Sequence, residues 1–468
     1  MSNKLDVWCM RNQHKDIKGL LRKIVSLLLT AVMCMTLVSC KDAERNDEAE
    51  PQDEQVPEVQ YLPIRVTGSL HDSRILEYGA KTAHGYYEII YWDGSMLPED
   101  HGYKGYGNIA YTDYATCQRV ILCNVPGCAH NTSDCTSFVQ FSGMPRLFTD
   151  YSETHLYLMS SGKNEEDMKP DDVGTVTEMN MDGSERRTIC TLTAGETFKY
   201  NSVQIASDEY FYQEISHVEM IPNPNKDNEK IPAEQYVLER IWFADGRREK
   251  VYTTRNDFEA RETVLSVWNN EDLIINSSEY YEDGTAAGYR NRVSQKGELI
   301  ERIGPESTFG YYSDRFRITG EEKDKKATVT AIDYATGEVM TIKDVPAESL
   351  LPGRIYISNR DGYKVLWHFL DEEEISRDYV LDFSDGTYRE FTLLQKNALE
   401  EKKIAIISDA GDDYFVLVGK EANSFTLIDM QGIPHSFSVP EYPTYALISK
   451  DDFWNCVPNY RLIDNKIK

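Results

Sequence analysis

The sequence has little positive charge and only one long apolar run. Lys and Arg number 50 against 78 Asp and Glu in 468 residues, which gives a net charge of −28. A surface this acidic repels phosphate backbones, which argues against nucleic acid as a partner. The single uncharged apolar run, residues 24–40, excludes a polytopic membrane protein. With 41% hydrophobic and 27% charged residues, the chain is not disordered and most of it can bury a core.

Motifs that usually mark an active site are also absent from the sequence. It contains no Gly-rich phosphate loop, no Gly-x-Ser-x-Gly elbow and no His-Glu-x-x-His. It has no Cys-x-x-Cys redox motif either. We therefore assign no catalytic residue, and an enzyme is the less favoured class of function.

The N-terminus is typical of an export signal. Six basic residues lie before residue 24, and the uncharged run 24–40 (IVSLLLTAVMCMTLVSC) follows them. A basic region followed by a short apolar region is the order of a secretory signal. The run ends in Leu37-Val38-Ser39-Cys40, which resembles the bacterial lipobox, and this resemblance implies that Cys40 is lipidated and becomes the mature N-terminus. The alternative is an uncleaved signal anchor, which usually needs about 20 apolar residues.

Both interpretations place the rest of the chain outside the cytoplasm. We expect it at the outer face of the bacterial cell membrane, held by the lipid at Cys40. Residues 41–60 contain eight acidic and two basic residues, two prolines and no apolar period, so we expect a solvated tether. The predicted organisation is a signal peptide with lipobox at 1–39, the lipidated Cys and acidic tether at 40–60, and a folded domain at 61–468.

From residue 61 onward, short runs rich in Tyr, Ile, Val, Thr and Phe alternate with turn residues. Asp-Gly pairs between such runs favour type I′ hairpin turns, in which both central residues have positive φ. The pairs are Asp93-Gly94, Asp182-Gly183, Asp245-Gly246, Asp283-Gly284, Asp361-Gly362 and Asp385-Gly386. Several hairpins along one chain indicate consecutive antiparallel meanders.

A unit made of an apolar strand, a turn and a second strand occurs seven times. The units are residues 109–122, 176–192, 239–254, 289–304, 328–342, 378–393 and 424–439. Further strands lie between them, so each cycle holds about four strands, which is typical of a β-propeller. We predict an all-β fold, a β-propeller of about seven four-stranded blades. Two β-sandwiches in tandem are the alternative.

Several features together resemble one group of exported proteins. The lipobox, the acidic tether, units such as TEMNMDGSERRTI (177–189) and the tail ISKDDFWNCVPNYRLI (448–463) are similar to the β-propeller lipoproteins of Firmicutes, especially clostridia. Those proteins resemble TolB-like propellers. The similarity spans most of residues 60–468 and implies a fold rather than an activity.

The most specific signal in the folded domain is a group of cysteines with one histidine. Cys123, Cys128, His130 and Cys135 are spaced C-x4-C-x-H-x4-C, a block that matches a motif of the clostridial lipoproteins. Three thiolates and one imidazole complete a tetrahedral zinc shell, so we predict a structural zinc site. Exported thiols also tend to form disulfides, and a disulfide within the block or unpaired thiols remain alternatives.

Three further cysteines of the folded domain lie outside this block, at Cys117, Cys190 and Cys456. Cys117 occupies the place of turn Gly337 in a similar repeat unit, so we expect it to be a turn residue. The histidines other than His130 are scattered singly along the mature chain, and we expect strand or loop positions for them.

These observations favour a membrane-anchored lipoprotein whose propeller is a binding or scaffolding module for an unknown protein or carbohydrate ligand. The ligand is expected where loops from all blades converge. One alternative is a propeller glycoside hydrolase or lyase that acts on extracellular glycans through loop carboxylates. Another is a structural subunit of an envelope complex.

Overall fold

A computed structural model provides the structure of the folded domain, and Gln60–Lys468 forms one compact unit. The predicted signal segment, Cys40 and the predicted acidic tether lie outside the described residues. The structure describes residues 61–68, 79–91, 105–141, 145–160, 173–199, 202–222, 230–256, 259–281, 286–306, 310–312, 316–333, 335–347, 355–361, 363–370, 376–396 and 402–464.

In this part of the chain, the strands form seven consecutive meanders of four antiparallel strands each. Meander 1 contains β2 (Ala80–Lys81), β3 (Gly85–Tyr91), β4 (Gly105–Asp113) and β5 (Gln118–Ile121). Meander 2 contains β7 (Pro145–Thr149), β8 (His155–Ser160), β9 (Thr175–Asn180) and β10 (Arg187–Thr191). Meander 3 contains β12 (Ile205–Ala206), β13 (Tyr210–Pro222), β14 (Lys230–Trp242) and β15 (Arg248–Thr254).

The second half of the domain continues in the same way. Meander 4 contains β16 (Ala260–Trp268), β17 (Asp272–Tyr280), β18 (Ala286–Val293) and β19 (Leu299–Glu306). Meander 5 contains β20 (Gly310–Tyr312), β21 (Phe316–Lys323), β22 (Lys326–Asp333) and β23 (Val339–Pro346). Meander 6 contains β24 (Ile355–Asp361), β25 (Lys364–Leu370), β26 (Ser376–Asp382) and β27 (Thr387–Glu390). Meander 7 contains β28 (Ala405–Ala410), β29 (Asp413–Asp429), β30 (Pro434–Ser449) and β31 (Tyr460–Leu462).

Three short strands and one helix complete the described elements. Strand β1 (Arg65–Val66) pairs with β12, β11 (Glu196–Phe198) pairs with β13, and β6 (Phe138–Phe141) pairs with β4. Helix α2 (Lys450–Trp454) is capped by the Ser449 hydroxyl and buries Phe453 and Trp454. Within the described ranges, no helix has the length and apolar character needed to cross a bilayer.

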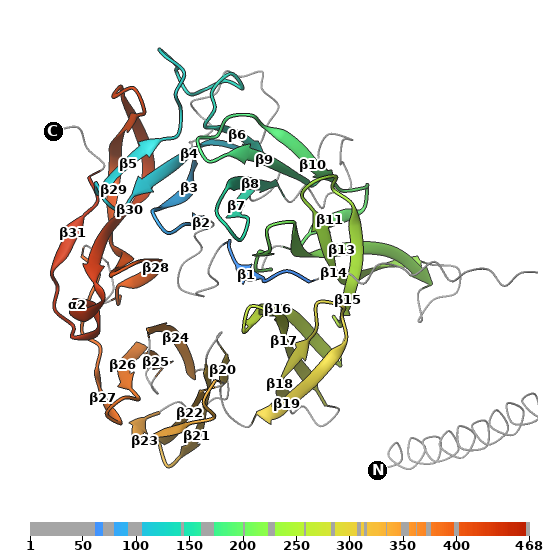
Figure 1. The fold of residues 1–468 in the computed structure, drawn as a ribbon, viewed down its shortest axis with the longest axis vertical. Helices are drawn as coiled ribbons and strands as arrows, with labels where there is room; N and C mark the ends of the chain where they lie inside the picture. Colours follow the sequence, from blue (N-terminus) through green and yellow to red (C-terminus); the bar gives the residue numbers. More distant parts are fainter. Residues whose placement is uncertain are drawn as a thin grey trace, which may run out of the picture. The chain divides into compact units, whose positions relative to one another are not determined.

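The meanders are arranged as a ring, so the fold is the predicted all-β propeller (Figure 1). They form six hydrogen-bonded sheets, because meanders 1 and 7 join edge to edge into a single nine-stranded sheet. The join is a parallel pair between β5 and β29, in which Val120 lies opposite Ile428 and Ile121 opposite Asp429. The expected count of about seven blades is therefore corrected to six, one of which contains two meanders.

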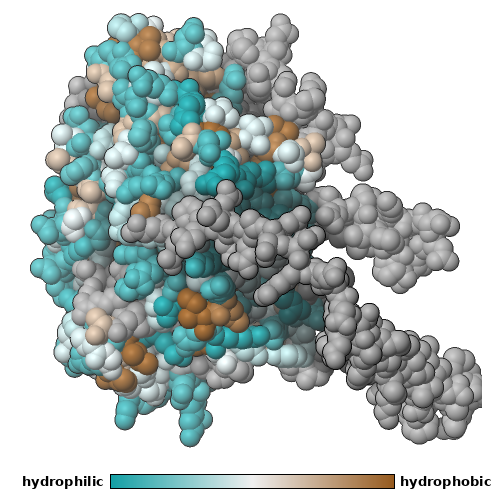
Figure 2. Space-filling view, turned by 45° about the vertical axis from the view of Figure 1, so that its right-hand side comes forward, coloured by the Kyte–Doolittle hydropathy of each residue, from teal (hydrophilic) through white to brown (hydrophobic). Residues whose placement is uncertain are grey.

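Alternating side chains explain why these strands stack. In β22, Ala327, Val329 and Ala331 are buried while the residues between them are only partly covered. These buried residues pack against Val365 and Trp367 of β25 in the next meander. A four-stranded sheet by itself cannot bury both of its faces, whereas in a ring each sheet packs against neighbours on both sides. On the face shown in Figure 2, hydrophilic residues predominate and the apolar ones gather in small separate patches.

Three of the Asp-Gly pairs, at Gly183, Gly246 and Gly386, lie in hairpin turns of the described residues, and for these the predicted type I′ geometry is wrong. Asp93-Gly94, Asp283-Gly284 and Gly362 lie outside the described residues. Gly183, Gly246 and Gly386 have φ of 81°, 67° and 73°, whereas the aspartate before each has no positive φ. The aspartate side chain instead accepts a hydrogen bond from the backbone N–H two residues ahead, as Asp385 Oδ1 does from Thr387 at 3.0 Å. This local bond stabilises a turn in which only the glycine is left-handed.

The seventh sequence repeat occupies a different place from the other six. The first six units supply the third and fourth strands of meanders 1 to 6. Residues 424–439 instead form the far half of the long hairpin β29–β30, the second and third strands of meander 7. This half of the hairpin carries Ile428 and Asp429 to the edge of meander 1. The extension is therefore what joins the last meander to the first.

A buried ion pair lies beside this join. Arg119 Nη2 of β5 is 2.5 Å from Glu88 Oε1 of β3, and the Arg119 side chain is 2% exposed. Tyr445 of β30 donates its hydroxyl to Glu88 Oε2 at 3.2 Å, and the Arg119 guanidinium lies 5.3 Å from the Tyr445 ring centre. Burial raises the pKa of Glu88, and the nearby Arg119 charge opposes that shift. One charged group therefore connects both sides of the closure.

Replacing Arg119 with Met should destabilise the domain strongly, because it leaves the Glu88 carboxylate buried without its cation. Breaking a buried pair in this way costs about 3–5 kcal/mol. Chemical denaturation monitored by fluorescence measures the change. The matched control is Arg187→Met, whose ion pair with Glu178 involves a 50% exposed arginine and should cost about 1 kcal/mol or less. Equal losses in the two variants would contradict a special role for the closure pair.

Candidate functional site

The four predicted site residues lie in one loop, residues 122–137, between β5 and β6. Both strands pair with β4, and the two ends of the loop meet there. The Leu122 N–H donates to the Ile109 carbonyl at 2.9 Å, and the Ile109 N–H donates to the Ser137 carbonyl at 2.8 Å. Because both ends are fixed on one residue of β4, Cys123 and Cys135, which lie next to these ends, are brought close together.

A tight turn returns the chain toward Cys123. The Cys128 N–H donates to the Val125 carbonyl at 3.2 Å across Pro126 and Gly127. Gly127 has a φ of 70°, and a Cβ there would meet no atom within 4 Å. Glycine is therefore favoured by the backbone conformation of this turn and not by lack of space.

His130 is turned inward by its own backbone. Its φ is 59°, in the left-handed region that costs an ordinary residue about 1–2 kcal/mol. The buried Asn108 of β4 donates its side-chain amide to the His130 carbonyl at 3.1 Å and to the Ser137 hydroxyl at 2.8 Å. These bonds hold both arms of the loop to the same strand.

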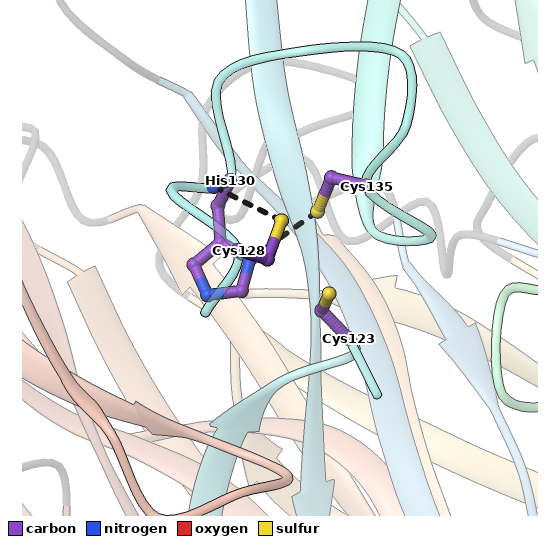
Figure 3. A group of neighbouring side chains, drawn as sticks. All are labelled: Cys123, Cys128, His130 and Cys135. Carbon is purple, nitrogen blue, oxygen red and sulfur yellow. Dashed lines mark hydrogen bonds between the residues drawn. The ribbon is translucent and has the colours of Figure 1, made fainter. Parts of the chain in front are cut away.

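The loop gathers the three sulfur atoms and one imidazole nitrogen into a compact group (Figure 3). The ligand atoms of Cys123, Cys128, His130 and Cys135 all lie within 4.8 Å of one another, and His130 Nδ1 is 3.2 Å from Cys135 Sγ. At the bond lengths usual for zinc, the ligand atoms of a tetrahedral shell are separated by about 3.3–3.8 Å. The group therefore has the composition and the size of a four-ligand metal site.

Backbone donors prepare two of the sulfur atoms for a negative charge. The Val125 N–H points at Cys123 Sγ at 3.4 Å, and the His130 N–H points at Cys128 Sγ at 3.3 Å. For Cys123, burial opposes ionisation, but the hydrogen bonds from Val125 and Thr136 lower the pKa of the thiol. Burial raises the pKa of Cys128, and it raises that of Cys135 to about 12. An ion that stabilises thiolates would have its largest effect at Cys135.

His130 is poised as a neutral ligand. Its side chain is fully buried. Burial, followed by the neighbouring His435, lowers the pKa of His130 below its ordinary value. A neutral imidazole keeps a lone pair for a metal.

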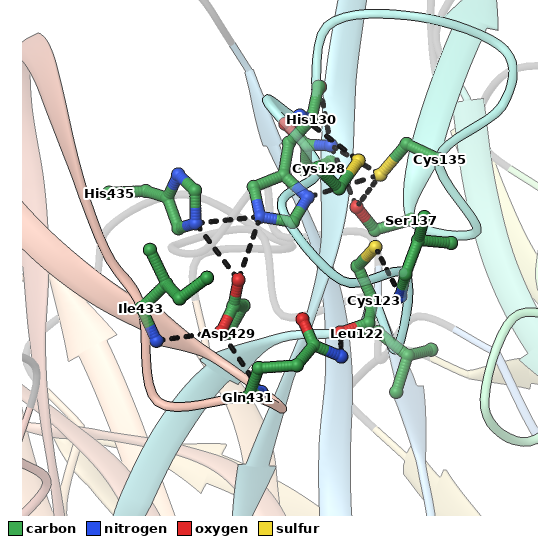
Figure 4. Close-up of polar contacts among 12 residues, drawn as sticks. Leu122, Cys123, Cys128, His130, Cys135, Ser137, Asp429, Gln431, Ile433 and His435 are labelled. Carbon is green, nitrogen blue, oxygen red and sulfur yellow. Dashed lines mark hydrogen bonds and ion pairs between the residues drawn. The ribbon is translucent and has the colours of Figure 1, made fainter.

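Two residues that sequence reasoning missed complete the surroundings of His130. The hairpin tip of meander 7 places His435 Nε2 2.8 Å from His130 Nε2, and Asp429 Oδ2 3.1 Å from His435 Nε2 (Figure 4). The side chain of Gln431, on the same tip, donates to the Cys123 carbonyl at 3.1 Å. His435, like the other histidines outside the block, was expected only to be a strand or loop residue. It lies 305 residues from His130 in sequence, and no local pattern links the two.

The other cysteines of the described domain lie away from the loop. These three cysteines and the three of the cluster are all free thiols. Cys117 has a φ of 55°, close to the 71° of Gly337, which confirms its predicted role as a turn residue. Cys190 is buried between meanders 2 and 3, and burial raises the pKa of its thiol to about 11. Cys456 is half-buried beyond helix α2.

A second group of functional interest lies at the inner edge of the ring, where Figure 1 shows β1, β2 and β7 around its middle. Arg65 Nη2 of β1 is 2.9 Å from Glu153 Oε1, in the turn between β7 and β8. Lys81 of β2 is near enough to both, and to Asp409 of β28, for their charges to act on it. Charged side chains from several meanders therefore meet at one place.

Lys81 stands out within this charged inner edge. It is half-buried, and no hydrogen bond or ion pair reaches its ammonium group from the residues that the structure describes. Burial, followed by the charge of Arg65, lowers the pKa of Lys81, whereas Asp409 and Glu153 oppose that shift. A desolvated cation with free donors is suited to an anionic group of a ligand.

Carboxyl groups with a raised pKa are spread over the ring. In the described ranges these are Glu88 on β3, Glu214 on β13 and Glu322 on β21. Glu88 is paired with Arg119, and Glu214 is 2.7 Å from Lys199 Nζ. Since each lies in a different meander, these three do not form the neighbouring pair that glycoside hydrolysis uses.

No protein-family model matches the chain, and no curated protein matches it. Solved structures similar to it include an oligogalacturonate lyase from Vibrio parahaemolyticus, at 11% identity and a TM-score of 0.39 over 76% of this chain and 97% of the lyase. TolB from Acinetobacter baumannii is similar at 11% identity and a TM-score of 0.30, over 83% and 79% of the two chains. An acylaminoacyl peptidase from Pyrococcus horikoshii is similar at 11% identity and a TM-score of 0.42 over 83% of this chain. The match covers only 52% of the peptidase. Similarity at this level does not indicate an activity for this chain. The propeller fold is established by the strand pairing of the chain itself.

If the loop binds a metal ion, chelation should lower the melting temperature of the purified protein, whereas a reductant alone should not. With Cys135→Ser, the protein should lose the equivalent of metal that the loop binds, and the effect of the chelator on the loop should disappear, because one of four ligands is lost. Cys190→Ser, which removes a buried thiol outside the loop, is the control and should keep its metal. Elemental analysis and thermal unfolding measure both effects. Blocked thiols that only a reductant releases would show a disulfide instead.

Proposed function

We propose that this chain is an exported, lipid-anchored β-propeller that serves as a binding or scaffolding module at the outer face of the bacterial membrane. In this proposal it belongs with the propeller lipoproteins of Firmicutes that its sequence resembles. The ring binds a ligand at its charged inner edge, and a structural zinc ion fastens the loop 122–137.

The anchor is supported by the N-terminal sequence. The lipobox-like residues Leu37 to Cys40 follow a basic region and an apolar run. A thioether-linked lipid at Cys40 contributes about 0.8 kcal/mol per buried methylene to membrane binding. The composition of residues 41–60, with eight acidic residues, two basic residues and two prolines, supports a solvated tether between this anchor and the folded domain.

The meeting of Arg65, Lys81 and Glu153 at the inner edge carries the binding function. These residues come from β1, β2 and the β7–β8 turn, so they are adjacent only in the closed ring. Glu153 is held by Arg65 and by the Ala83 N–H at 2.8 Å, which leaves Lys81 as the free cation. A ligand with a carboxylate, such as an acidic sugar or a peptide, has the charge that this arrangement favours.

Zinc is the ion that best fits the loop. Three thiolates and one imidazole are a soft donor set, which Mg²⁺ and Ca²⁺ avoid and which zinc accepts in tetrahedral geometry. Since the protein supplies all four ligands, no position is left for a substrate. The ion therefore stabilises the fold instead of taking part in a reaction.

Changing Cys40 to Ser should abolish lipid attachment, because the serine hydroxyl cannot form the thioether. Labelling of cells with a fatty-acid probe should give no signal for this variant, and the protein should leave the membrane fraction. Cys34→Ser, which alters the same apolar run outside the lipobox, is the control and should label normally. Unchanged labelling of the Cys40 variant would refute the anchor.

Changing Lys81 to Met should weaken binding at the inner edge. A thermal-shift screen of carboxylate-bearing oligosaccharides and peptides, followed by calorimetric titration of each ligand found, provides the measurement. Loss of a hydrogen bond to a charged group, about 1.5–3 kcal/mol, corresponds to about a 10- to 150-fold loss of affinity. The control is Lys326→Met, a 61% exposed residue paired with Asp344, which should bind as before. Equal affinity in the two variants would place the ligand elsewhere.

A further inference from the structure

The tip of hairpin β29–β30 forms a second cluster of metal-ligating atoms next to the first. His130 Nε2, His435 Nε2 and Asp429 Oδ2 lie 2.8, 3.1 and 3.4 Å apart in their three pairings. The side chains of His130 and Asp429 are fully buried, and that of His435 is 17% exposed. The residues come from opposite sides of the closure, one from meander 1 and two from meander 7.

Protons alone cannot satisfy this triangle of atoms. A hydrogen bond needs a donor on one side and an acceptor on the other. Each of the three atoms is either a donor or an acceptor, so at least two of them have the same role and cannot bond to each other. If only one imidazole nitrogen carries a proton, the other nitrogen faces the carboxylate as a second acceptor. If both carry protons, the two N–H groups face each other at 2.8 Å. One contact of the three is therefore always between like partners, which is costly for buried groups.

A cation removes this conflict, because all three atoms can offer it a lone pair. The three separations are close to the value of about 3.3 Å expected between nitrogen or oxygen ligands around a tetrahedral zinc ion. The Asp429 carboxylate is also oriented in advance. Its other oxygen, Oδ1, accepts the backbone N–H groups of Gln431 at 3.0 Å and Ile433 at 2.8 Å, which leaves Oδ2 directed at the histidines.

We propose that His130, Asp429 and His435 bind a second divalent ion of the zinc class, so that the His130 ring bridges two ions. Its Nδ1 faces the thiolates and its Nε2 faces the new site. Binding of the second ion displaces the proton that Nε2 carries when only the first ion is bound, and that proton passes to solvent. The inference rests on the proposed zinc at the cysteine cluster.

The second site differs from the first in having an open position. Two imidazoles and one carboxylate supply three ligands, and zinc with three protein ligands takes a water molecule or another exchangeable ligand in the fourth position. The partial exposure of His435 leaves this position accessible from solvent. The second ion is therefore able to hold an anionic group, whereas the first is enclosed.

Zinc content of the purified full-length protein tests the proposal. We expect two ions per chain in the unaltered protein, and one in both His435→Ala and Asp429→Asn. His155→Ala, which removes a histidine paired with Asp150 outside the site, is the matched control and should keep two. If unaltered protein and both tip variants hold the same number of ions, the second site does not exist.

Cobalt substitution separates failure of this inference from failure of the cysteine site. Cobalt bound by thiolates shows an intense near-ultraviolet charge-transfer band, which the second site, without sulfur, cannot produce. His435→Ala should keep this band and lose one equivalent of cobalt, whereas Cys135→Ser should lose the band. One cobalt with a full band in both the unaltered protein and His435→Ala would overturn the second site and leave the first intact. Absence of the band in the unaltered protein would overturn both. Asp429→Asn provides the same comparison if His435→Ala does not fold.

Discussion

Closure of the ring is the constraint on which the rest of the structure depends. Shared clusters of buried side chains link most neighbouring meanders. The first and last meanders lie at opposite ends of the domain's sequence, so their contact must form between distant parts of the chain. Strand β1, the first in the described residues, pairs with β12 of meander 3 and not with meander 7. The ring is closed by the extended hairpin β29–β30, whose tip pairs with β5, and by the buried contacts of Glu88, Arg119 and Tyr445 beside it.

The cysteine loop lies at this same junction, so a metal ion bound there would affect the closure of the ring. The loop leaves and rejoins one edge of β4, and the hairpin tip contacts it through Gln431 and His435. An ion held there would rigidify the surface on which the tip docks. Because such an ion binds the folded chain in preference to the unfolded one, its binding free energy adds to the stability of the closed ring.

The propeller could be predicted from the sequence because its signals are local and repeated. The strand–turn–strand units and the Asp-Gly turns locate the hairpins, and Cys117 falls at a left-handed turn position as Gly337 predicted. The number of sheets could not be obtained in this way, since the seventh unit looks like the others but is the extension of a hairpin. The turn type was missed because the aspartate side chains bond to the backbone, which only coordinates reveal. The C-x4-C-x-H-x4-C spacing identified four cluster residues, while Asp429 and His435 had no signal of their own.

The distance of 305 residues between His130 and His435 has a consequence for how this site forms. Cys123, Cys128, His130 and Cys135 are close in sequence, so their cluster requires only that one loop folds on β4. The triangle with Asp429 and His435 exists only after the last meander has docked. Contacts of such high sequence separation carry the greatest loop-closure entropy, and they form late in folding for that reason. The metal-ligating residues of the tip therefore come together only in the closed ring. The four metal-ligating residues of the loop can come together before the last meander has docked.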